Sequence, residues 1–391
     1  MFNKTISIIG GTGHVGLPLG LFLAKKNFNV KLIDINLKNI KKVNNGMMPF
    51  KEEKAKFILK DLIKKNKLYA TNNFELIKKS KFVIICIGTP VNSKLKPETK
   101  NFLNAFKKIK KYISKNSIIV IRSSVYPGIS NKVYEICKNK NINISYCPER
   151  IVQGKSLIEL PKLPQIISGF SYRSINESVK LFSKISKKTI VTSVTEAELI
   201  KLFSNSFRYI MFSISNQFFK ICNDLNIDFD KLRKNMIDGY DRNSGIAKPG
   251  FTAGPCLLKD TMQLSSFLKN KFHLGYAAMS INESIPEYLV DNLNNKNKLK
   301  NKTVGVLGMA FKAETDDVRD SLSIKLINYL KKKKIKYIYS DPYYKDKFCI
   351  DEINLVKKSD VIIVTVPHNK YKKLKIPKNK KIVDIWNVIP K

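Results

Sequence analysis

Short apolar segments alternate with helical segments along the first part of this chain. Each apolar segment has the length of a strand, and together they occupy residues 5–9, 29–33, 82–87, 117–122 and 143–146. Strands that alternate with helices in this way form parallel sheets with helices on both faces. The pattern therefore predicts an α/β domain over residues 1–190.

A different pattern runs from Thr195 to about Leu232. Apolar residues recur there at helical spacing over a span much longer than an average helix, which indicates a helical spine between domains. A further helical stretch reaches about Leu289, and the polar, low-complexity residues 291–302 are typical of a linker. We therefore expect a central helical domain over residues 191–297.

Strand and helix alternation begins again at Thr303. A helix is expected from about Ser321, with strands near residues 336–340, 361–366 and 381–386. These elements predict a smaller α/β domain over residues 298–391. The predicted fold class is α/β, with two Rossmann-like α/β domains joined by a long central helical segment.

The composition of the chain argues against several classes of protein. The formal net charge is +41, but Lys accounts for most of the excess and is spread along the chain without an aromatic platform, so nucleic-acid binding is disfavoured. The apolar segments are too short to span a membrane, and the N-terminus lacks the pattern of a signal peptide. Six scattered cysteines without a C-x-x-C motif fit a reducing cytoplasm.

The first strand leads into a glycine-rich turn. Gly11, Gly13 and Gly16 form a G-x-G-x-x-G pattern that opens a helix, which suits a tight turn, close approach of a pyrophosphate and helix–strand packing. Asp34 ends the second strand, where an acidic residue binds the ribose hydroxyls. Its charge disfavours a 2′-phosphate. The sequence therefore predicts a dinucleotide site that prefers NAD to NADP.

Small and polar residues follow the next strands. The segments are Gly88–Thr89–Pro90, residues 123–128 (S-S-V-Y-P-G) and residues 147–155 (C-P-E-R-I-V-Q-G-K). A ligand crevice forms at the carboxyl ends of parallel strands. Glu149 and Arg150 are either a surface ion pair or part of a site loop, and their location favours the loop.

A lone cysteine stands out in residues 249–260, P-G-F-T-A-G-P-C-L-L-K-D. Cys256 follows a glycine-containing turn and precedes Lys259 and Asp260, which is typical of a nucleophile on a tight loop. The alternative is a buried apolar cysteine. Lys201 and Asn205 share one helix face, because they are four residues apart. They are either solvated surface groups or cationic and amide donors to a site.

The histidines suggest neither a catalytic relay nor a metal site. His14 lies in the glycine loop, His273 in a helical stretch and His368 in a loop. A Ser-His-Asp or metal mechanism therefore finds no support.

In their order along the chain, these motifs resemble the UDP-glucose/GDP-mannose dehydrogenase family of nucleotide-sugar 6-dehydrogenases. The resemblance covers nearly the whole chain and adds F-K-A-E-T-D-D-V-R-D-S from Phe311, S-D-P-Y from Ser340 and V-P-H from Val366. The chain departs from the family at Gly254–Pro255, where many members carry Gly-Ser or Gly-His. The resemblance implies oxidation of the C6 alcohol of a UDP-sugar to the acid with two NAD⁺, through a thiohemiacetal and a thioester on Cys256.

The resemblance also implies roles for particular residues. The catalytic set would be Cys256, Lys201, Asn205, Asp260, Glu149 and Thr89. The cofactor-binding set would be Gly11, Gly13, His14, Val15, Gly16, Asp34, Thr89, Ser124, Lys259 and Arg319. The substrate-binding set would be Glu149, Arg150, Lys201, Asn205, Arg242, Phe251, Gly254, Phe311 and Lys312. In this family Arg242 would reach a neighbouring subunit, so a homodimer built on the central helix is expected.

The residues after Pro148 select among sugars. The segment P-E-R-I-V-Q-G-K-S-L-I-E-L resembles members that act on UDP-N-acetylhexosamines, so UDP-N-acetylmannosamine or UDP-N-acetylglucosamine is expected for a surface polysaccharide precursor, with UDP-glucose as the alternative. A non-catalytic NAD-binding regulator is a further alternative. Retention of Cys256, Lys201, Asn205 and Asp260 together argues against it.

Overall fold

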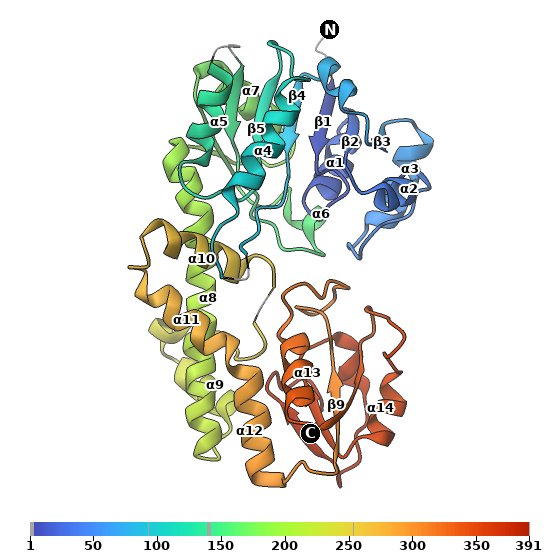
Figure 1. Ribbon diagram of the computed structural model, residues 1–391, viewed down its shortest axis with the longest axis vertical. Helices are drawn as coiled ribbons and strands as arrows, with labels where there is room; N and C mark the ends of the chain where they lie inside the picture. The colour runs from blue at the N-terminus through green and yellow to red at the C-terminus, as the bar shows by residue number, and fades with distance from the viewer. Residues whose placement is uncertain (1–3, 93, 139–141, 253, 391) are drawn as a thin grey trace. The chain divides into compact units, whose positions relative to one another are not determined.

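A computed structural model describes residues 4–92, 94–138, 142–252 and 254–390 of this chain. The chain forms two compact units, Met1–Ser204 and Asn205–Lys391, and the long helix α8 (Val194–Asp224) contributes residues to both (Figure 1). The finer division at residues 190 and 297 stays a prediction. None of the described helices combines the length and apolarity needed to cross a membrane.

The first unit is built on a sheet in the order β3-β2-β1-β4-β5-β6-β7-β8. All neighbouring pairs are parallel except β6 and β7. The strands are β1 (Thr5–Ile9), β2 (Asn29–Ile33), β3 (Leu68–Thr71), β4 (Phe82–Ile85), β5 (Ile118–Ile121), β6 (Asn143–Tyr146), β7 (Gln165–Gly169) and β8 (Thr189–Val191). The strand order reverses between β1 and β4, so the carboxyl ends of these strands are where a ligand crevice forms.

Helices cover both faces of this sheet (Figure 1). The central strands are apolar on both sides: Ile6 and Ile8 of β1 enter one core with α1, α3 and α7, whereas Ile9 enters the other with α4 and α5. The helices are α1 (Gly16–Lys25), α2 (Leu37–Asn44), α3 (Ala55–Lys64), the 3₁₀ helix η1 (Phe74–Lys79), α4 (Thr99–Lys110), α5 (Ile129–Cys137), α6 (Ser156–Glu159) and α7 (Tyr172–Phe182).

The helical region differs from its prediction at two places. The expected continuous helix to Leu232 ends at Asp224, and α9 begins at Phe229 because the Asp228 carboxylate accepts the N–H groups of Asp230 and Lys231. The other helices here are η3 (Asp241–Asn243), α10 (Leu257–Phe267), α11 (His273–Glu283) and α12 (Ile285–Asn297).

The linker predicted from Asp291 is wrong over its first half. Residues 291–297 continue α12, whose Leu289, Val290 and Leu293 are buried in the core beside the second sheet. The polar residues occupy the outer side of this helix, because an amphipathic helix needs apolar residues on one stripe only. Composition alone therefore suggested a linker where a helix continues.

The second unit contains a parallel sheet in the order β10-β9-β11-β12. Its elements are β9 (Thr303–Leu307), α13 (Leu322–Lys332), β10 (Lys336–Ser340), α14 (Glu352–Lys358), β11 (Val361–Val364), η4 (Asn369–Lys373) and β12 (Lys381–Asp384). Helices α12 and α13 share one core with this sheet, and residues of α14 lie in the other. The order reverses between β9 and β11, so their carboxyl ends are a second place where a ligand crevice is expected. The predicted α/β fold class with a second parallel-sheet domain is confirmed.

A buried arginine ties the carboxyl ends of β5 and β6 together. Arg122 follows β5 and is 1% exposed. Its guanidinium pairs with the Glu149 carboxylate and donates to the carbonyl of Cys147 at 3.0 Å and to Oε1 of Gln165 at 2.8 Å. The guanidinium also lies 4.6 Å from the centre of the Phe182 ring. Because Cys147 and Glu149 belong to the loop after β6 while Gln165 and Phe182 belong to β7 and α7, Arg122 fixes the start of that loop against its neighbours.

We predict that Arg122→Gln lowers the free energy of unfolding by about 3–5 kcal/mol, since it leaves the buried Glu149 carboxylate without its counter-charge. Thermal and denaturant unfolding measure the change. Lys65→Gln is the control, because its ion pair with Asp61 is exposed and should matter much less. A double variant, Arg122→Met with Glu149→Met, should recover part of the loss. Equal effects of Arg122→Gln and Lys65→Gln would contradict this account.

Candidate active site

The glycine loop between β1 and α1 has the shape of a pyrophosphate cradle. A Cβ at Gly11 would lie 2.7 Å from the Ile8 carbonyl oxygen, and one at Gly16 would lie 2.4 Å from that of Gly10. A Cβ at Gly13 would meet only the Gly10 oxygen, at 3.4 Å, so its hydrogen faces open space. Helix α1 begins at Gly16, directly after Val15. Glycine is therefore needed for packing at two positions and leaves room for a ligand at the third.

Asp34 is held at the edge of this loop. Its Oδ2 accepts the Thr12 N–H at 2.9 Å and the Thr12 hydroxyl at 2.7 Å, and its Oδ1 accepts the Asn36 N–H at 3.0 Å. The carboxylate is partly exposed after β2. A ribose with two free hydroxyls suits this place, whereas a 2′-phosphate would be repelled. The residues present therefore fit NAD.

Other residues predicted for the cofactor lie at neighbouring strand ends in the first unit. The Thr89 hydroxyl donates to the Ser124 carbonyl, which joins the segments after β4 and β5. The His14 ring lies 4.0 Å from the Phe50 ring and contacts the Gln153 side chain at 3.5 Å. The loop after β6 thereby meets the glycine loop.

Glu149 is an anchor of the loop after β6, because its carboxylate is nearly fully hydrogen-bonded. Oε2 accepts from Arg122, and Oε1 accepts the N–H groups of Arg150 at 2.8 Å and Ile151 at 3.1 Å. The Arg150 guanidinium donates to the Pro164 carbonyl, and burial lowers the pKa of Arg150. Both side chains are therefore held by the loop itself, which favours the site-loop interpretation over a surface ion pair.

A second carboxylate holds the far end of this loop. Glu52 is 7% exposed and accepts the N–H groups of Gly154 at 3.0 Å and Ser156 at 2.6 Å, as well as the Ser156 hydroxyl. Burial raises the pKa of Glu52, although these hydrogen bonds oppose the shift. Our sequence reasoning missed Glu52, because more than one hundred residues separate it from its partners and no local pattern joins them.

Cys256 is an exposed thiol, and it immediately precedes α10. The position before a helix favours a thiolate, because the first backbone N–H groups carry partial positive charge. Cys147, in contrast, is fully buried, and burial raises its pKa to about 12. The alternative of a buried apolar cysteine at position 256 is therefore wrong. Ala253 of the same motif lies outside the described residues.

Asp260, one turn into α10, forms the centre of a polar cluster. It is 0% exposed and accepts a 2.6 Å hydrogen bond from the Asn205 amide of α8. Lys259 pairs with the other carboxylate oxygen at 2.9 Å. Lys201 is buried one turn before Asn205, so its ammonium is not a solvated surface group. The Asp260 carboxylate, the Lys259 ammonium and the Asn205 amide of this cluster all belong to residues that the sequence identified as candidates.

The loop after β9 brings a predicted substrate residue, Phe311, and a predicted cofactor residue, Arg319, to the cysteine motif. Gly254 has φ +110°, and a Cβ there would lie 2.3 Å from the Phe311 ring, so only glycine lets the ring pack on this backbone. Arg319 pairs with Asp317 at 2.6 Å, and this hydrogen bond raises the pKa of Arg319. The charge of Cys256 acts in the same direction, which indicates that Arg319 lies near the thiol.

The remaining predicted residues occupy different surroundings. Phe251 is buried in the core beside the second sheet, and Lys312 lies in the loop after β9. Arg242 is exposed in η3, with its guanidinium 5.8 Å from the centre of the Tyr240 ring. The predicted residues thus fall into a group around β1, β4, β5 and β6 and a group around α10 and β9.

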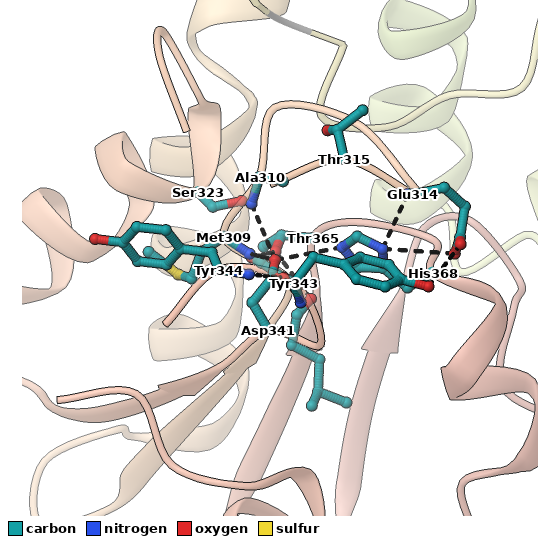
Figure 2. A network of polar contacts seen from close by, with 12 residues as sticks. Met309, Ala310, Glu314, Thr315, Ser323, Asp341, Tyr343, Tyr344, Thr365 and His368 are labelled. Atoms are coloured by element: carbon teal, nitrogen blue, oxygen red, sulfur yellow. Dashed lines mark hydrogen bonds and ion pairs between the residues drawn. The ribbon is translucent and has the colours of Figure 1, made fainter. Parts of the chain in front are cut away.

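A buried histidine–aspartate pair lies at the second crevice (Figure 2). His368 and Asp341 are both 0% exposed, and their Nε2 and Oδ2 atoms are 3.3 Å apart. Asp341 Oδ2 also accepts the N–H groups of Met309 and Ala310. Burial by itself would raise the pKa of Asp341, but its hydrogen bonds outweigh burial and lower the pKa to about 2. The sequence placed His368 in a loop and missed this pair, although S-D-P-Y and V-P-H contain both residues.

Among the described residues, no group of His, Cys, Asp and Glu side chains could hold a metal ion.

Three sequence profiles of one family match the chain in succession. The NAD binding domain of the UDP-glucose/GDP-mannose dehydrogenase family matches residues 4–186, its central domain matches residues 195–284, and its UDP binding domain matches residues 305–391. Together they cover most of the chain. The match confirms the predicted NAD cofactor and oxidoreductase class.

Individual proteins agree with these profiles. The UDP-N-acetyl-D-mannosamine dehydrogenase of Methanococcus vannielii is 29% identical over 99% of this chain and 93% of its own length. A UDP-glucose 6-dehydrogenase of Rickettsia bellii is 27% identical over 97% of this chain and 94% of its own. The solved UDP-D-ManNAc dehydrogenase of Pyrococcus horikoshii has a TM-score of 0.90 at 27% identity and covers 99% and 96% of the two chains. This chain belongs to the UDP-glucose/GDP-mannose dehydrogenase family of NAD-dependent dehydrogenases.

Proposed function

We propose that this enzyme oxidises the C6 alcohol of a UDP-N-acetylhexosamine, UDP-N-acetylmannosamine first, to the uronic acid in two steps. Each step transfers a hydride to one NAD⁺. The alcohol becomes an aldehyde, the Cys256 thiolate adds to it as a thiohemiacetal, and the second hydride transfer leaves a thioester. Water then releases the carboxylate and regenerates the thiol. The enzyme would act in the cytoplasm. Its product would be a precursor of a surface polysaccharide.

The observation that carries this proposal is the exposed Cys256 thiol at the start of α10. A thiolate is a strong nucleophile near neutral pH and a good leaving group, which suits both formation and hydrolysis of a thioester. The next residues of the helix supply the buried Asp260 and its partner Lys259. This combination supports a covalent enzyme rather than an NAD-binding regulator.

The polar cluster on α8 and α10 suits the charges that develop in the reaction. Lys201 and the Asn205 amide would stabilise the oxyanion of the tetrahedral adduct. Asp260, held by Asn205, would orient the hydrolytic water. Thr89 would help to hold water in this site. Glu149 would act through water in the family pattern, but its hydrogen bonds to Arg122 and to the backbone support a role in shaping the loop.

The cofactor would lie over the carboxyl ends of β1 and β4. Gly11, Gly13, His14, Val15 and Gly16 would surround the pyrophosphate, and Asp34 would bind the adenosine ribose. Thr89 and Ser124 would line the same edge of the sheet. The family resemblance also assigns Lys259 and Arg319 to the cofactor.

The UDP group would bind the crevice of the second sheet. Lys312 and Phe311 belong to the loop after β9, at the point where the strand order reverses. Lys312 would pair with the diphosphate, while Phe251, Gly254 and Arg150 would shape the sugar site. UDP-N-acetylmannosamine is preferred because the Methanococcus vannielii and Pyrococcus horikoshii relatives carry that activity in their names. UDP-glucose is the second candidate, supported by the Rickettsia bellii relative.

Initial rates of NADH formation across four nucleotide sugars test the substrate. We expect kcat/KM for UDP-N-acetylmannosamine to exceed that for UDP-glucose by roughly ten-fold or more, since a polar site built for the acetamido group is left unpaired by its absence. UDP-N-acetylglucosamine isolates the effect of the C2 configuration, and GDP-mannose tests whether a guanine nucleotide without the acetamido group is accepted. A preference for UDP-glucose would overturn the choice of sugar but not the dehydrogenase activity.

Replacement of Cys256 tests the covalent mechanism. Cys256→Ala should lower turnover by roughly a thousand-fold or more, because the thioester step is lost. Cys256→Ser should accumulate an acyl-enzyme visible by intact mass, since a serine ester hydrolyses slowly. Cys349→Ala is the matched control and should keep near wild-type turnover. Two NADH per sugar from Cys256→Ala at the wild-type rate would exclude the cysteine as nucleophile.

We also propose that two copies of the chain pair through an apolar stripe on α8. Phe203 and Phe207 are 54% and 64% exposed, and Ile214, Phe218, Ile221 and Leu225 continue the exposed series at helical spacing. An exposed apolar stripe of this size is unusual for a monomer, and a symmetric pair would bury it twice. Exposed Arg242 would then be available to the partner's sugar site.

A charged substitution in this stripe tests whether the stripe is the dimer interface. Phe207→Lys should convert a dimer into a monomer in light scattering at micromolar concentration, because a buried ammonium would lack a partner. Phe57→Lys is the control, since Phe57 is 82% exposed on α3 and away from the stripe. A wild-type monomer, or a Phe207→Lys dimer of unchanged stability, would contradict the proposed interface.

A further inference from the structure

The loop after β9, residues 308–320, carries Phe311, Lys312 and Arg319, and it is held at two places by side chains from other strands. At its start, Asp341 Oδ2 accepts the N–H groups of Met309 at 2.7 Å and Ala310 at 3.1 Å. In its middle, the Glu314 N–H donates to Nδ1 of His368 at 3.1 Å. Lys312 lies between these two attachment points. Figure 2 shows the imidazole ring between Asp341 and Glu314.

The hydrogen bonds define the protonation pattern of His368. Nδ1 accepts the Glu314 N–H, so it carries no proton. The proton of the neutral ring is then on Nε2, which faces Asp341 Oδ2 at 3.3 Å. Asp341 is fixed in turn, because its Oδ1 accepts the N–H groups of Tyr343 at 2.7 Å and Tyr344 at 2.9 Å. The ring is thereby aligned to receive one particular backbone N–H.

The loop conformation at Glu314 needs such support. Glu314 has φ +61°, a left-handed conformation that is costly for a residue with a side chain. The Glu314 N–H donates to His368. The Glu314 carboxylate accepts the Asn369 N–H at 2.9 Å and the Tyr343 hydroxyl at 2.6 Å. The Lys312 carbonyl, two residues earlier, accepts the Thr315 hydroxyl at 2.9 Å. A left-handed turn held by several hydrogen bonds, one of them to the buried His368, therefore follows Lys312.

A histidine–aspartate pair also occurs in proton relays, but this pair has a different geometry. In a relay, the second ring nitrogen faces a hydroxyl or thiol that it deprotonates. Here that nitrogen accepts the Glu314 N–H and lies 3.7 Å from the Glu314 carboxylate, and the side chains of His368 and Asp341 are completely buried. The pair consequently acts on the loop rather than on a substrate.

We propose that His368, oriented by Asp341, is a positioning residue that holds the loop after β9 in the conformation that binds the nucleoside diphosphate. This inference rests on the proposed UDP site in the second sheet. His368 does not touch the ligand; it acts through Glu314 and Lys312. Its removal should therefore weaken binding of UDP through Lys312. NAD⁺ binding should change little, because Arg319, the residue of this loop assigned to the cofactor, is held by Asp317 and not by His368.

Calorimetric titration with UDP alone and with NAD⁺ alone tests the proposal. His368→Leu should weaken UDP binding roughly ten-fold, the effect of losing one buried hydrogen bond, and should leave the NAD⁺ affinity within about two-fold. His368→Asn keeps an amide oxygen near the position of Nδ1 and should recover most of the UDP affinity. His273→Leu is the matched control, because His273 is exposed at the start of α11.

A folded His368→Leu variant that binds UDP like the wild type would overturn the proposal. If His368→Leu does not fold, His368→Asn decides, since a ten-fold loss of UDP affinity despite the retained acceptor would also overturn it. Failure of the wild type to bind UDP would instead remove the proposed UDP site itself. The two failures are therefore distinguishable.

The wild-type protein offers an independent spectroscopic test. The chain has three histidines, so ¹⁵N-histidine labelling gives a simple spectrum that His14 and His273 variants assign. We expect the neutral imidazole of His368 to be the tautomer that is protonated at Nε2. A proton on Nδ1 would contradict the bond from Glu314 and with it the positioning role.

Discussion

Buried or partly buried carboxylates that accept backbone N–H groups hold the loops on which the site of this enzyme is built. Asp34 holds Thr12 in the glycine loop, and Glu149 and Glu52 hold the two ends of the loop after β6. Asp341 does the same for the start of the loop after β9. Loops at the ends of parallel strands have backbone donors without sheet partners, and a buried carboxylate satisfies two or more of them at once.

This constraint connects the stability of the loops with their chemistry. A backbone N–H that binds a phosphate or a sugar cannot also donate fully within the protein. The N–H groups of the same loop that face the protein therefore need acceptors from elsewhere in the chain. A carboxylate as buried as Glu149 also needs a counter-charge, and Arg122 supplies it. Cys256 differs from these groups. Its thiol is exposed at the start of a helix, where it is available to react.

Local features of the chain were predictable from sequence, whereas partnerships between distant segments were not. The glycine loop was found because Gly11, Gly13 and Gly16 serve one turn within six residues. The strand–helix alternation likewise led to the correct fold class, and the ordered motifs led to the family. The continuation of α12 through Asp291 was missed, since Leu293 is the one apolar residue among the polar residues 291–297 that suggested a linker. Arg122, Glu52 and His368 were missed because each is defined by a partner distant in sequence.

The central claim is that one active site carries out both oxidations through Cys256 and releases the acid. The most direct measurement is the yield of NADH when UDP-N-acetylmannosamine is limiting and NAD⁺ is in excess, with the product identified by mass spectrometry. The account predicts two NADH for each sugar nucleotide and a uronic acid as the only product. One NADH per sugar, with aldehyde released into solution, would contradict it.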